Sequence, residues 1–309
     1  MLTIYKTTEQ GLEQLESIAN GTWVKAIDPT PEETQQLVNW GIDVEYINYS
    51  LDLDEMPRIE RDDDYTFILI RIPHRQPNDD IPYITIPLGI MIKGNIIVTI
   101  CRYDKEMFKV LANGKYRLLK TGKRYRFALY IFLETATRYL THLREINRMT
   151  EAIEDQLQKS TRNREVLELL KYQKSLTYFA TALRSNEVMM ERVQRTQIFN
   201  YYEDDQDLLE DVLTENQQAI QMTNINTEIL SSMMDAFASI ISNNLNSVMK
   251  ALAALTIIVS LPGTVASFFG MNVILPLSES NSTAFLVIFG IALALTAIAT
   301  FIFYKRDWF

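Results

Sequence analysis

The sequence predicts an α+β membrane protein with an N-terminal cytosolic α/β domain, a long helical stalk and two C-terminal transmembrane helices. Three observations lead to this fold class. Apolar, β-branched runs recur in the first 120 residues, the 139 residues between Gly122 and Pro262 contain neither glycine nor proline, and two uncharged apolar runs lie near the C-terminus. We place the boundaries at 1–120 for the α/β domain, 121–248 for the stalk and 249–309 for the transmembrane region.

The first 120 residues alternate between apolar runs and turn signals. Five β-branched runs are separated by glycine, proline and asparagine, as is typical of short strands. A helix should begin at Thr30, because Thr30 can serve as N-cap, Pro31 suits the first turn and Glu33 completes a capping box. The expected strands are 2–5, 23–27, 65–72, 84–92 and 96–100.

Composition narrows the class of protein. With 309 residues, a net charge of −9 and one cysteine, the chain has room for one cytosolic core besides its membrane part. The start at Met1 lacks the basic and apolar regions of a signal peptide, so we expect the N-terminus to stay inside. Cys101 is interpreted as a buried thiol in a reducing compartment. The acidic balance argues against nucleic acid as a partner.

The α/β region contains no pattern that indicates catalysis. We find no glycine-rich phosphate loop, no Ser/His/Asp or Cys/His set and no metal-ligand spacing around His74 and His142. Both histidines are interpreted as ordinary core or surface residues. The sequence therefore predicts that the protein is not an enzyme and needs no organic cofactor.

The stretch without glycine or proline must form long helices. Turn-like clusters at 160–163 and 200–204 divide it into three. The third should begin near Asp205 and continue to Phe269, a length of about 97 Å. Its apolar positions recur every three to four residues, as in a coiled-coil seam. These positions are Leu208, Val212, Ala219, Met222, Ile225, Ile229, Met233, Phe237 and Ile240.

The two apolar runs, 251–269 and 284–304, have 19 and 21 residues. As helices they would be about 28 to 32 Å long, which matches the hydrocarbon core of a bilayer. Lys250, Lys305 and Arg306 lie just outside the runs, and no lysine or arginine lies between Lys250 and Lys305. The positive-inside rule therefore places both termini in the cytosol and the loop 270–283 outside, as in a multi-pass protein of the cytoplasmic membrane.

The first run carries a polar stripe when it is projected around a helix at about 100° per residue. All its hydroxyl groups lie on one face. This stripe is either a helix-packing surface of small residues or the lining of a water-filled pore, and a pore needs a ring of several copies. The second run has only Thr296 and Thr300 before Tyr304 and is interpreted as an outer, lipid-facing helix. The stripe consists of Asn246, Met249, Ala253, Thr256, Ser260, Gly263, Thr264 and Ser267.

These residues resemble the CorA-type magnesium channels. The tripeptide Gly270-Met271-Asn272 directly follows the first apolar run, and only one more run precedes a basic C-terminus. The segment Asn246-Ser-Val-Met-Lys-Ala-Leu, 26 residues before Asn272, is similar to the cytosolic mouth of the family's pore. The run 56–65 is similar to part of the family's cytosolic domain. The resemblance implies a funnel-shaped homopentamer in which the long helices form the inner ring.

The resemblance also implies how an ion would be selected. Mg²⁺ holds its water tightly in octahedral geometry. A ring of carbonyl oxygens from Asn272 and the backbone of Gly270 can accept hydrogen bonds from that water without removing it. Gly270 would permit a sharp exit from the helix, and Met271 would pack behind the ring because a thioether binds hard cations poorly. Asn272 alone could otherwise be an ordinary helix C-cap.

Because of three departures from the family pattern, the sequence does not decide which metal ion is transported. Phe269 replaces a common tyrosine, the loop lacks a Pro-Glu pair, and Pro262 is shifted by one position. A zinc or cobalt transporter on the same scaffold and a non-conducting, membrane-tethered coiled-coil scaffold therefore remain alternatives to a Mg²⁺ channel.

A regulatory metal site is a further expectation. Six acids lie within 203–211, and most of them are expected to stabilise the helix start or to be solvated. Asp211, 35 residues before Asn246, matches the position that binds regulatory Mg²⁺ between protomers in the family. Tyr49 stands at the usual partner position, so Asp52 or Asp54 would substitute. Ions bridging subunits there would hold the closed state, and their loss would open it.

Overall fold

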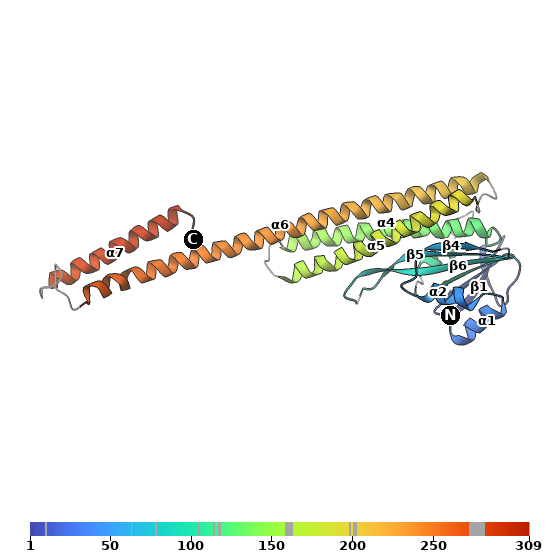
Figure 1. Cartoon of the computed structure of the whole chain (residues 1–309), viewed down its shortest axis with the longest axis horizontal. Helices are drawn as coiled ribbons and strands as arrows, with labels where there is room; N and C mark the ends of the chain where they lie inside the picture. Colours follow the sequence, from blue (N-terminus) through green and yellow to red (C-terminus); the bar gives the residue numbers. More distant parts are fainter. Residues whose placement is uncertain are drawn as a thin grey trace. The chain divides into compact units, whose positions relative to one another are not determined.

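The computed structural model describes residues 1–9, 11–62, 64–77, 79–103, 106–113, 115–116, 119–157, 163–197, 199, 203–271 and 282–308. The chain divides into two compact units, Met1–Met234 and Asp235–Phe309 (Figure 1). The first contains a sheet and most of the helices, and the second contains the two apolar C-terminal helices. The boundaries at residues 120 and 248 stay a prediction.

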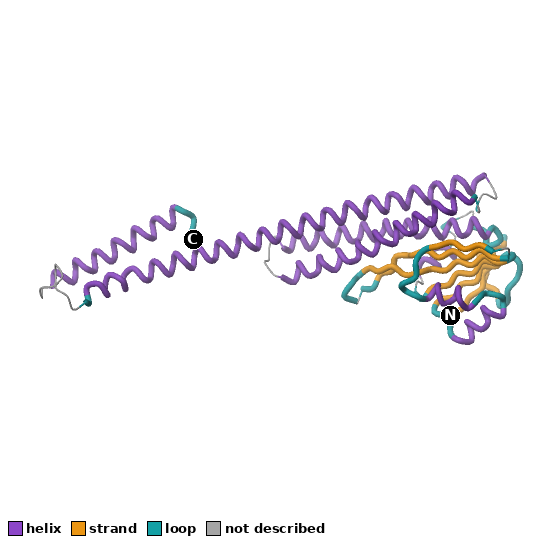
Figure 2. Tube along the Cα trace, viewed as in Figure 1, coloured by secondary structure: helices purple, strands orange, loops and turns teal. Residues whose placement is uncertain are grey.

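A seven-stranded sheet forms the centre of the first unit (Figure 2). Its strand order is β2-β1-β3-β7-β6-β5-β4, and every neighbouring pair is antiparallel except β3 and β7. In that parallel pair Val24 is opposite Val98. The strands are β1 (Leu2–Thr8), β2 (Gly11–Leu15), β3 (Thr22–Ile27), β4 (Arg58–Arg61), β5 (Tyr65–Arg75), β6 (Tyr83–Lys93) and β7 (Ile96–Cys101).

The two strands that the sequence did not predict, β2 and β4, lie at the two edges of the sheet. Their side chains are mostly polar and partly exposed, so neither strand shows an apolar run. They are held by backbone pairing, with Leu15 opposite Ile4 and Ile59 opposite Ile68. Helices α2 (Val44–Leu51) and α3 (Glu106–Ala112) were also not predicted.

Both faces of the sheet are buried. Trp23 contributes to a core with Phe127 of α4 (Arg124–Leu157), and the ring centroids are 5.0 Å apart. The next residue, Val24, points to the opposite face and joins Leu37 of α1 (Pro31–Asn39) and Ile47 of α2. Burial on both faces explains why the central strands are apolar at nearly every position.

The predicted start of α1 is confirmed. The Thr30 side chain accepts a hydrogen bond from the Glu33 backbone, and the Glu33 carboxylate accepts one from the Thr30 backbone, which completes the capping box. Glu33 also accepts a hydrogen bond of 2.7 Å from the Leu2 backbone. The cap therefore ties α1 to the first strand. Burial raises the pKa of Glu33, but its bonds to the N-terminal amine and to the Thr30 and Leu2 backbones outweigh burial and leave the pKa below its ordinary value.

Three long helices follow the sheet, as predicted: α4 (Arg124–Leu157), α5 (Asn163–Thr196) and α6 (Glu203–Phe269). Helix α6 has 67 residues and begins two residues before the predicted start. Asn186 of α5 joins the sheet, because its amide both donates to and accepts from the Arg71 backbone at 2.8 and 2.9 Å. Tyr139 of α4 donates to the Arg71 carbonyl at 3.0 Å.

The expected seam along α6 is only partly covered within one chain. Val212 and Ala219 are buried, whereas Ile225 and Ile229 are 56% and 46% exposed and Ile240 is exposed as well. Residues 225, 229 and 240 lie on one face of a helix at about 100° per residue. One chain therefore leaves an apolar row of α6 uncovered.

The second unit consists of the end of α6 and of α7 (Ser282–Lys305). Both helices are long and apolar enough to cross a membrane. Helix α7 ends in a Schellman motif, in which the Trp308 backbone donates to the Phe303 carbonyl at 3.1 Å and Asp307 adopts a φ of 52°. The Trp308 ring stacks on Phe303 at 5.0 Å.

Candidate functional site

All eight residues of the predicted stripe lie on α6 with exposed side chains or, for Gly263, an exposed backbone. The face of α6 that α7 contacts is a different one. There Ala254 is fully buried and Val265 is 9% exposed, and Pro262, Val265 and Ala266 form an apolar groove with α7 residues such as Phe289. At about 100° per residue this face lies roughly half a turn from the stripe. One chain therefore covers one side of α6 and leaves the hydroxyl side open.

The hydroxyl groups of the stripe have a defined orientation. Thr256 donates to the Leu252 carbonyl at 2.8 Å, and Thr264 donates to the Ser260 carbonyl at 2.9 Å. Ser260 donates to the carbonyl of Ile257, also at 2.9 Å. Because the hydroxyl hydrogens of these three residues are used inside the helix, their oxygen lone pairs are what they offer to the surroundings. Such acceptors suit water molecules whose hydrogens point away from a cation.

The predicted filter residues lie at the end of α6. The Gly270 backbone N–H still bonds to the Ala266 carbonyl at 2.9 Å, and Met271 is exposed. Helix α6 ends at Phe269, and Gly270 follows it in a turn without a left-handed φ. Asn272 and the loop up to residue 281 lie outside the described residues.

The basic residues expected at the cytosolic mouth flank the two apolar runs. Lys250 lies on α6 before the first apolar run, and Lys305 and Arg306 lie at the end of α7. All three side chains are exposed. Their positions agree with charged groups that stay in water beside an apolar span.

The three acids proposed for the regulatory site are exposed and separate within one chain. Asp211 lies on α6, whereas Asp52 caps the C-terminal end of α2 and its carboxylate accepts from the Asp54 backbone at 3.1 Å. No hydrogen bond or ion pair among the described residues joins Asp211 to either. No group of three His, Cys, Asp or Glu side chains in that part of the chain is arranged to hold a metal ion.

Tyr49 occupies a compact polar cluster instead of a metal site. Its hydroxyl donates to the Glu45 carboxylate, and the guanidinium of Arg58 lies 4.3 Å from the centre of its ring. The hydrogen bond to Glu45 raises the pKa of Tyr49, so its hydroxyl stays protonated and donates. A protonated phenol is a poor substitute for a carboxylate ligand of Mg²⁺.

One member of the acidic cluster, Asp205, is buried at the helix start rather than solvated. Asp205 is buried against Arg126 of α4, which also contacts Asp204 at 3.3 Å. The sequence contains no signal for this pair, since 79 residues separate the two partners. Asp205 therefore anchors the first turn of α6 and is unavailable as a metal ligand.

Comparisons with known proteins agree with this architecture. The chain matches the family described as CorA-like Mg2+ transporter protein over residues 19–306. It is 31% identical over 298 residues to the cobalt/magnesium transport protein CorA of Methanocaldococcus jannaschii, which covers 93% of this chain and 90% of that protein. The complete structure of the CorA magnesium transporter from that organism has a TM-score of 0.85 and 26% identity, covering 100% of this chain and 99% of the other.

A more distant structure shares the fold alone. Full-length CmaX has a TM-score of 0.72 at 15% identity and covers 100% of this chain and 97% of its own. The matches confirm the predicted α/β domain, long helix and two apolar C-terminal helices. They also confirm that the protein is an ion transporter rather than an enzyme. The chain belongs to the CorA-like Mg2+ transporter protein family.

Proposed function

We propose that the protein is a homopentameric channel that carries Mg²⁺ into the cell across the cytoplasmic membrane, with both termini in the cytosol. The observation that carries this proposal is the exposed hydroxyl stripe of α6, which lies opposite the face that contacts α7. A closed ring of copies would turn every stripe toward one axis and every α7 outward to lipid. The uncovered apolar row at Ile225, Ile229 and Ile240 supports assembly along the same helix.

Selection would act on the hydrated ion. The hydroxyl oxygens of Thr256, Ser260 and Thr264 are available as acceptors, so the stripe favours water oriented by a cation over water oriented by an anion. At the outer end, Asn272 and the Gly270 carbonyl would form the narrowest ring of neutral oxygens, with Met271 packed behind. Neutral oxygens can discriminate by hydrated size without binding the ion so tightly that it cannot leave.

Feedback by cytosolic Mg²⁺ would act through Asp211 and, on a neighbouring copy, Asp52 or Asp54. All three carboxylates are exposed, so a second protomer can reach them. An ion bridging two copies would neutralise carboxylates that otherwise repel each other. Because α6 is one helix from Glu203 to Phe269, the site lies on the same element as the stripe.

Cobalt or zinc transport on the same scaffold is the second candidate. The relative from Methanocaldococcus jannaschii is named a cobalt/magnesium transport protein, which favours cobalt as a second cargo. The ligand set argues against a dedicated zinc site, because the stripe and filter offer hydroxyl, amide and carbonyl oxygens, whereas zinc prefers imidazole and thiolate.

A non-conducting scaffold would need the stripe only for helix packing.

The decisive experiment is cation flux into liposomes that contain the purified protein. A fluorescent indicator should report Mg²⁺ uptake that empty liposomes do not show, and Co²⁺, Ni²⁺ and Zn²⁺ should be tested as cargo and as competitors. Uptake of Zn²⁺ without Mg²⁺ would favour the second candidate. If the correctly inserted protein carries none of these cations, the non-conducting scaffold is the remaining interpretation.

A further inference from the structure

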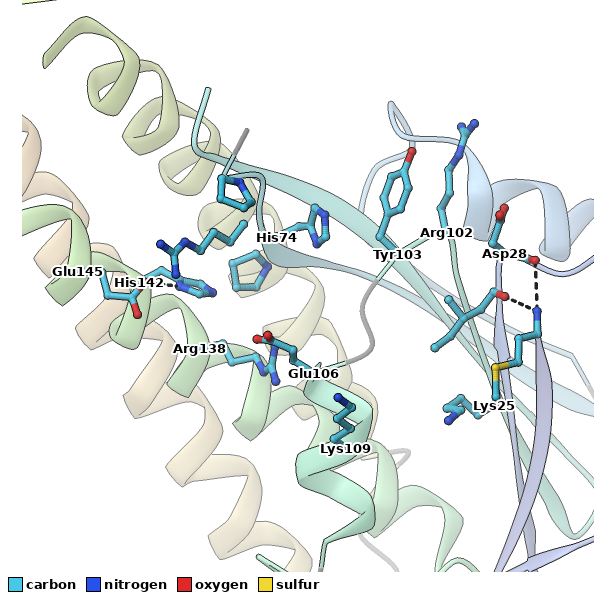
Figure 3. A pocket seen from close by; sticks show the side chains of 15 residues that line it. Lys25, Asp28, His74, Arg102, Tyr103, Glu106, Lys109, Arg138, His142 and Glu145 are labelled. Carbon is cyan, nitrogen blue, oxygen red and sulfur yellow. Dashed lines mark hydrogen bonds and ion pairs between the residues drawn. The ribbon is translucent and has the colours of Figure 1, made fainter. Parts of the chain in front are cut away.

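A cleft in the first unit is independent of the ion pathway. It has a volume of about 1000 Å³ and lies between the sheet, α3 and α4 (Figure 3). Small-molecule sites commonly occupy cavities of roughly 300 to 1000 Å³. The charged and aromatic residues that line it are Lys25, Asp28, His74, Arg75, Arg102, Tyr103, Glu106, Lys109, Arg138, His142 and Glu145.

The cleft opens at the carboxyl ends of the parallel strand pair. Strand β3 leads to Asp28 and β7 leads to Arg102, and the Asp28 backbone donates to the Cys101 carbonyl at 2.9 Å. In sheets with parallel strands, ligands bind outside the carboxyl ends. Asp28 also has a φ of 44°, a backbone conformation that a non-glycine residue rarely adopts and that occurs preferentially at functional sites.

The side chains of the cleft give it a positive character, although the chain as a whole is acidic. Five lysine and arginine residues line it against three carboxylates. Among the described residues, Lys25, Arg75, Arg102 and Lys109 form no salt bridge. One carboxylate is already engaged, since Glu145 accepts a hydrogen bond of 2.9 Å from Tyr83 and lies 3.1 Å from His142. Four of the cations that line the cleft therefore form no salt bridge within the part of the chain that the structure describes.

One wall of the cleft is flat. The rings of His74 and Tyr103 stack with centroids 5.2 Å apart and an interplanar angle of 18°. The guanidinium of Arg102 lies 5.9 Å from the Tyr103 ring centre. His74 comes from β5 and Tyr103 follows β7, so the sheet holds this wall in place. Flat π-surfaces beside cations are suited to a heteroaromatic ring as well as to a phosphate group.

We propose that this cleft binds a small polyphosphate anion, either inorganic or carried by a nucleotide. The cations Lys25, Arg75, Arg102 and Lys109 hold the phosphate oxygens, and the His74–Tyr103 wall contacts the remainder of the ligand. The site uses no residue of the stripe, the filter or the acidic regulatory position. Its existence therefore does not depend on the ion that the protein transports.

Isothermal titration calorimetry on the full-length protein in lipid nanodiscs tests this proposal. The probes are ATP, inorganic triphosphate and adenosine, each titrated in EDTA so that no divalent ion bridges ligand and protein. We expect saturable binding of triphosphate and ATP that weakens as NaCl is added. Equal affinities for both with no binding of adenosine would identify inorganic polyphosphate as sufficient. If ATP binds more tightly than inorganic triphosphate and adenosine also binds, the ligand of the cleft is a nucleotide. Either result supports the polyphosphate site.

Charge reversal locates the binding. Arg102→Glu with Lys109→Glu should reduce the affinity for triphosphate at least tenfold, by about 1.4 kcal/mol or more. The matched control, Lys120→Glu with Lys174→Glu, changes the net charge equally at exposed positions outside the cleft and should bind as the wild type does. If the reversed protein fails to fold, Arg102→Gln with Lys109→Gln replaces it. Absence of binding by the wild type, or equal affinities in the cleft and control variants, would overturn the proposal.

Discussion

The guanidinium of Arg126 on α4 binds the carboxylate of Asp205 on α6, and the two side chains are 6% and 1% exposed. Burial alone would lower the pKa of Arg126, but the hydrogen bond and charge of Asp205 outweigh it and raise the pKa. Arg126 therefore keeps its positive charge in the folded protein. It fixes the first turn of the long helix to the helix that covers the sheet.

Removing one partner of this pair should be strongly destabilising. Asp205→Ala removes the buried carboxylate that compensates the Arg126 charge, and breaking a buried ion pair in this way costs about 3 to 5 kcal/mol. Thermal unfolding in detergent should therefore occur at a clearly lower temperature. The control is Asp207→Ala, because Asp207 carries the same charge in the same acidic cluster but is exposed. Indistinguishable unfolding temperatures for the two variants would contradict the structural role of the pair. Arg126→Met with Asp205→Leu should recover part of the loss.

Stability should fall at mildly acidic pH because of His142. Burial lowers its pKa below the ordinary value of 6.5, against the opposing effect of Glu145 and with the help of Arg138 and Arg75. The unfolded chain then binds more protons than the folded chain below about pH 6.5, so the free energy of unfolding decreases as the pH drops through that range. Unfolding temperatures measured from about pH 7.5 to about pH 5.5 should show this decrease.

The variant His142→Gln tests the assignment. A glutamine can still donate to Glu145 but cannot titrate, so the decrease between the same pH values should be smaller than in the wild type. At more alkaline pH His142 is neutral in both states, and the two proteins should then depend on pH in the same way. If the unfolding temperature of His142→Gln falls as much at acidic pH as that of the wild type, other groups cause the decrease.

The hydroxyl stripe should be accessible to water in the assembled protein. Cysteine at Ser260 or Thr264 should react with small water-soluble thiol reagents, because these positions would line the pore. Cysteine at Ile258 or Val265 should not react, since these residues lie on the covered side of α6. The reaction is measured in a Cys101→Ser background. Equal labelling of both faces would rule out the pore stripe.

Asn272→Ala should abolish Mg²⁺ uptake while the protein still assembles. The neutral amide at the outer mouth has no charged neighbour in the tripeptide that could take over its acceptor oxygen. Flux is measured in liposomes, and assembly is checked by size-exclusion chromatography with light scattering. Wild-type uptake by a correctly assembled variant would refute the filter assignment.

Asp211→Ala should weaken the effect of Mg²⁺ on the closed state. If Mg²⁺ bridges subunits there, a hundredfold excess over Kd contributes about 2.7 kcal/mol per site, enough to protect the long helix against protease. The variant should need more Mg²⁺ for the same protection. The loss should be partial, since Tyr49 stands at the usual aspartate position and the neighbouring acids share the ion. Protease protection is measured against Mg²⁺ concentration for the wild type, for Asp211→Ala and for Asp52→Ala with Asp54→Ala. If the three curves coincide, regulation lies elsewhere.

The first helix, the long helices and the family could be predicted from the sequence, because their signals are local. The absence of glycine and proline over 139 residues requires long helices, and the Thr30 cap is contained in four neighbouring residues. The apolar runs and the Gly270-Met271-Asn272 tripeptide need no partner to be identified. The central strands are recognisable for the same reason, since burial on both faces makes them apolar throughout.

Other features were decided only by the tertiary structure, because they depend on residues far apart in the chain. Edge strands β2 and β4 are polar and are stabilised by backbone hydrogen bonds to neighbours, which leave no apolar pattern. Asp205 is indistinguishable in the sequence from the solvated acids around it until Arg126 is folded against it. The cleft likewise exists only because the parallel pairing of β3 with β7 brings Lys25 and Arg102 to one end of the sheet.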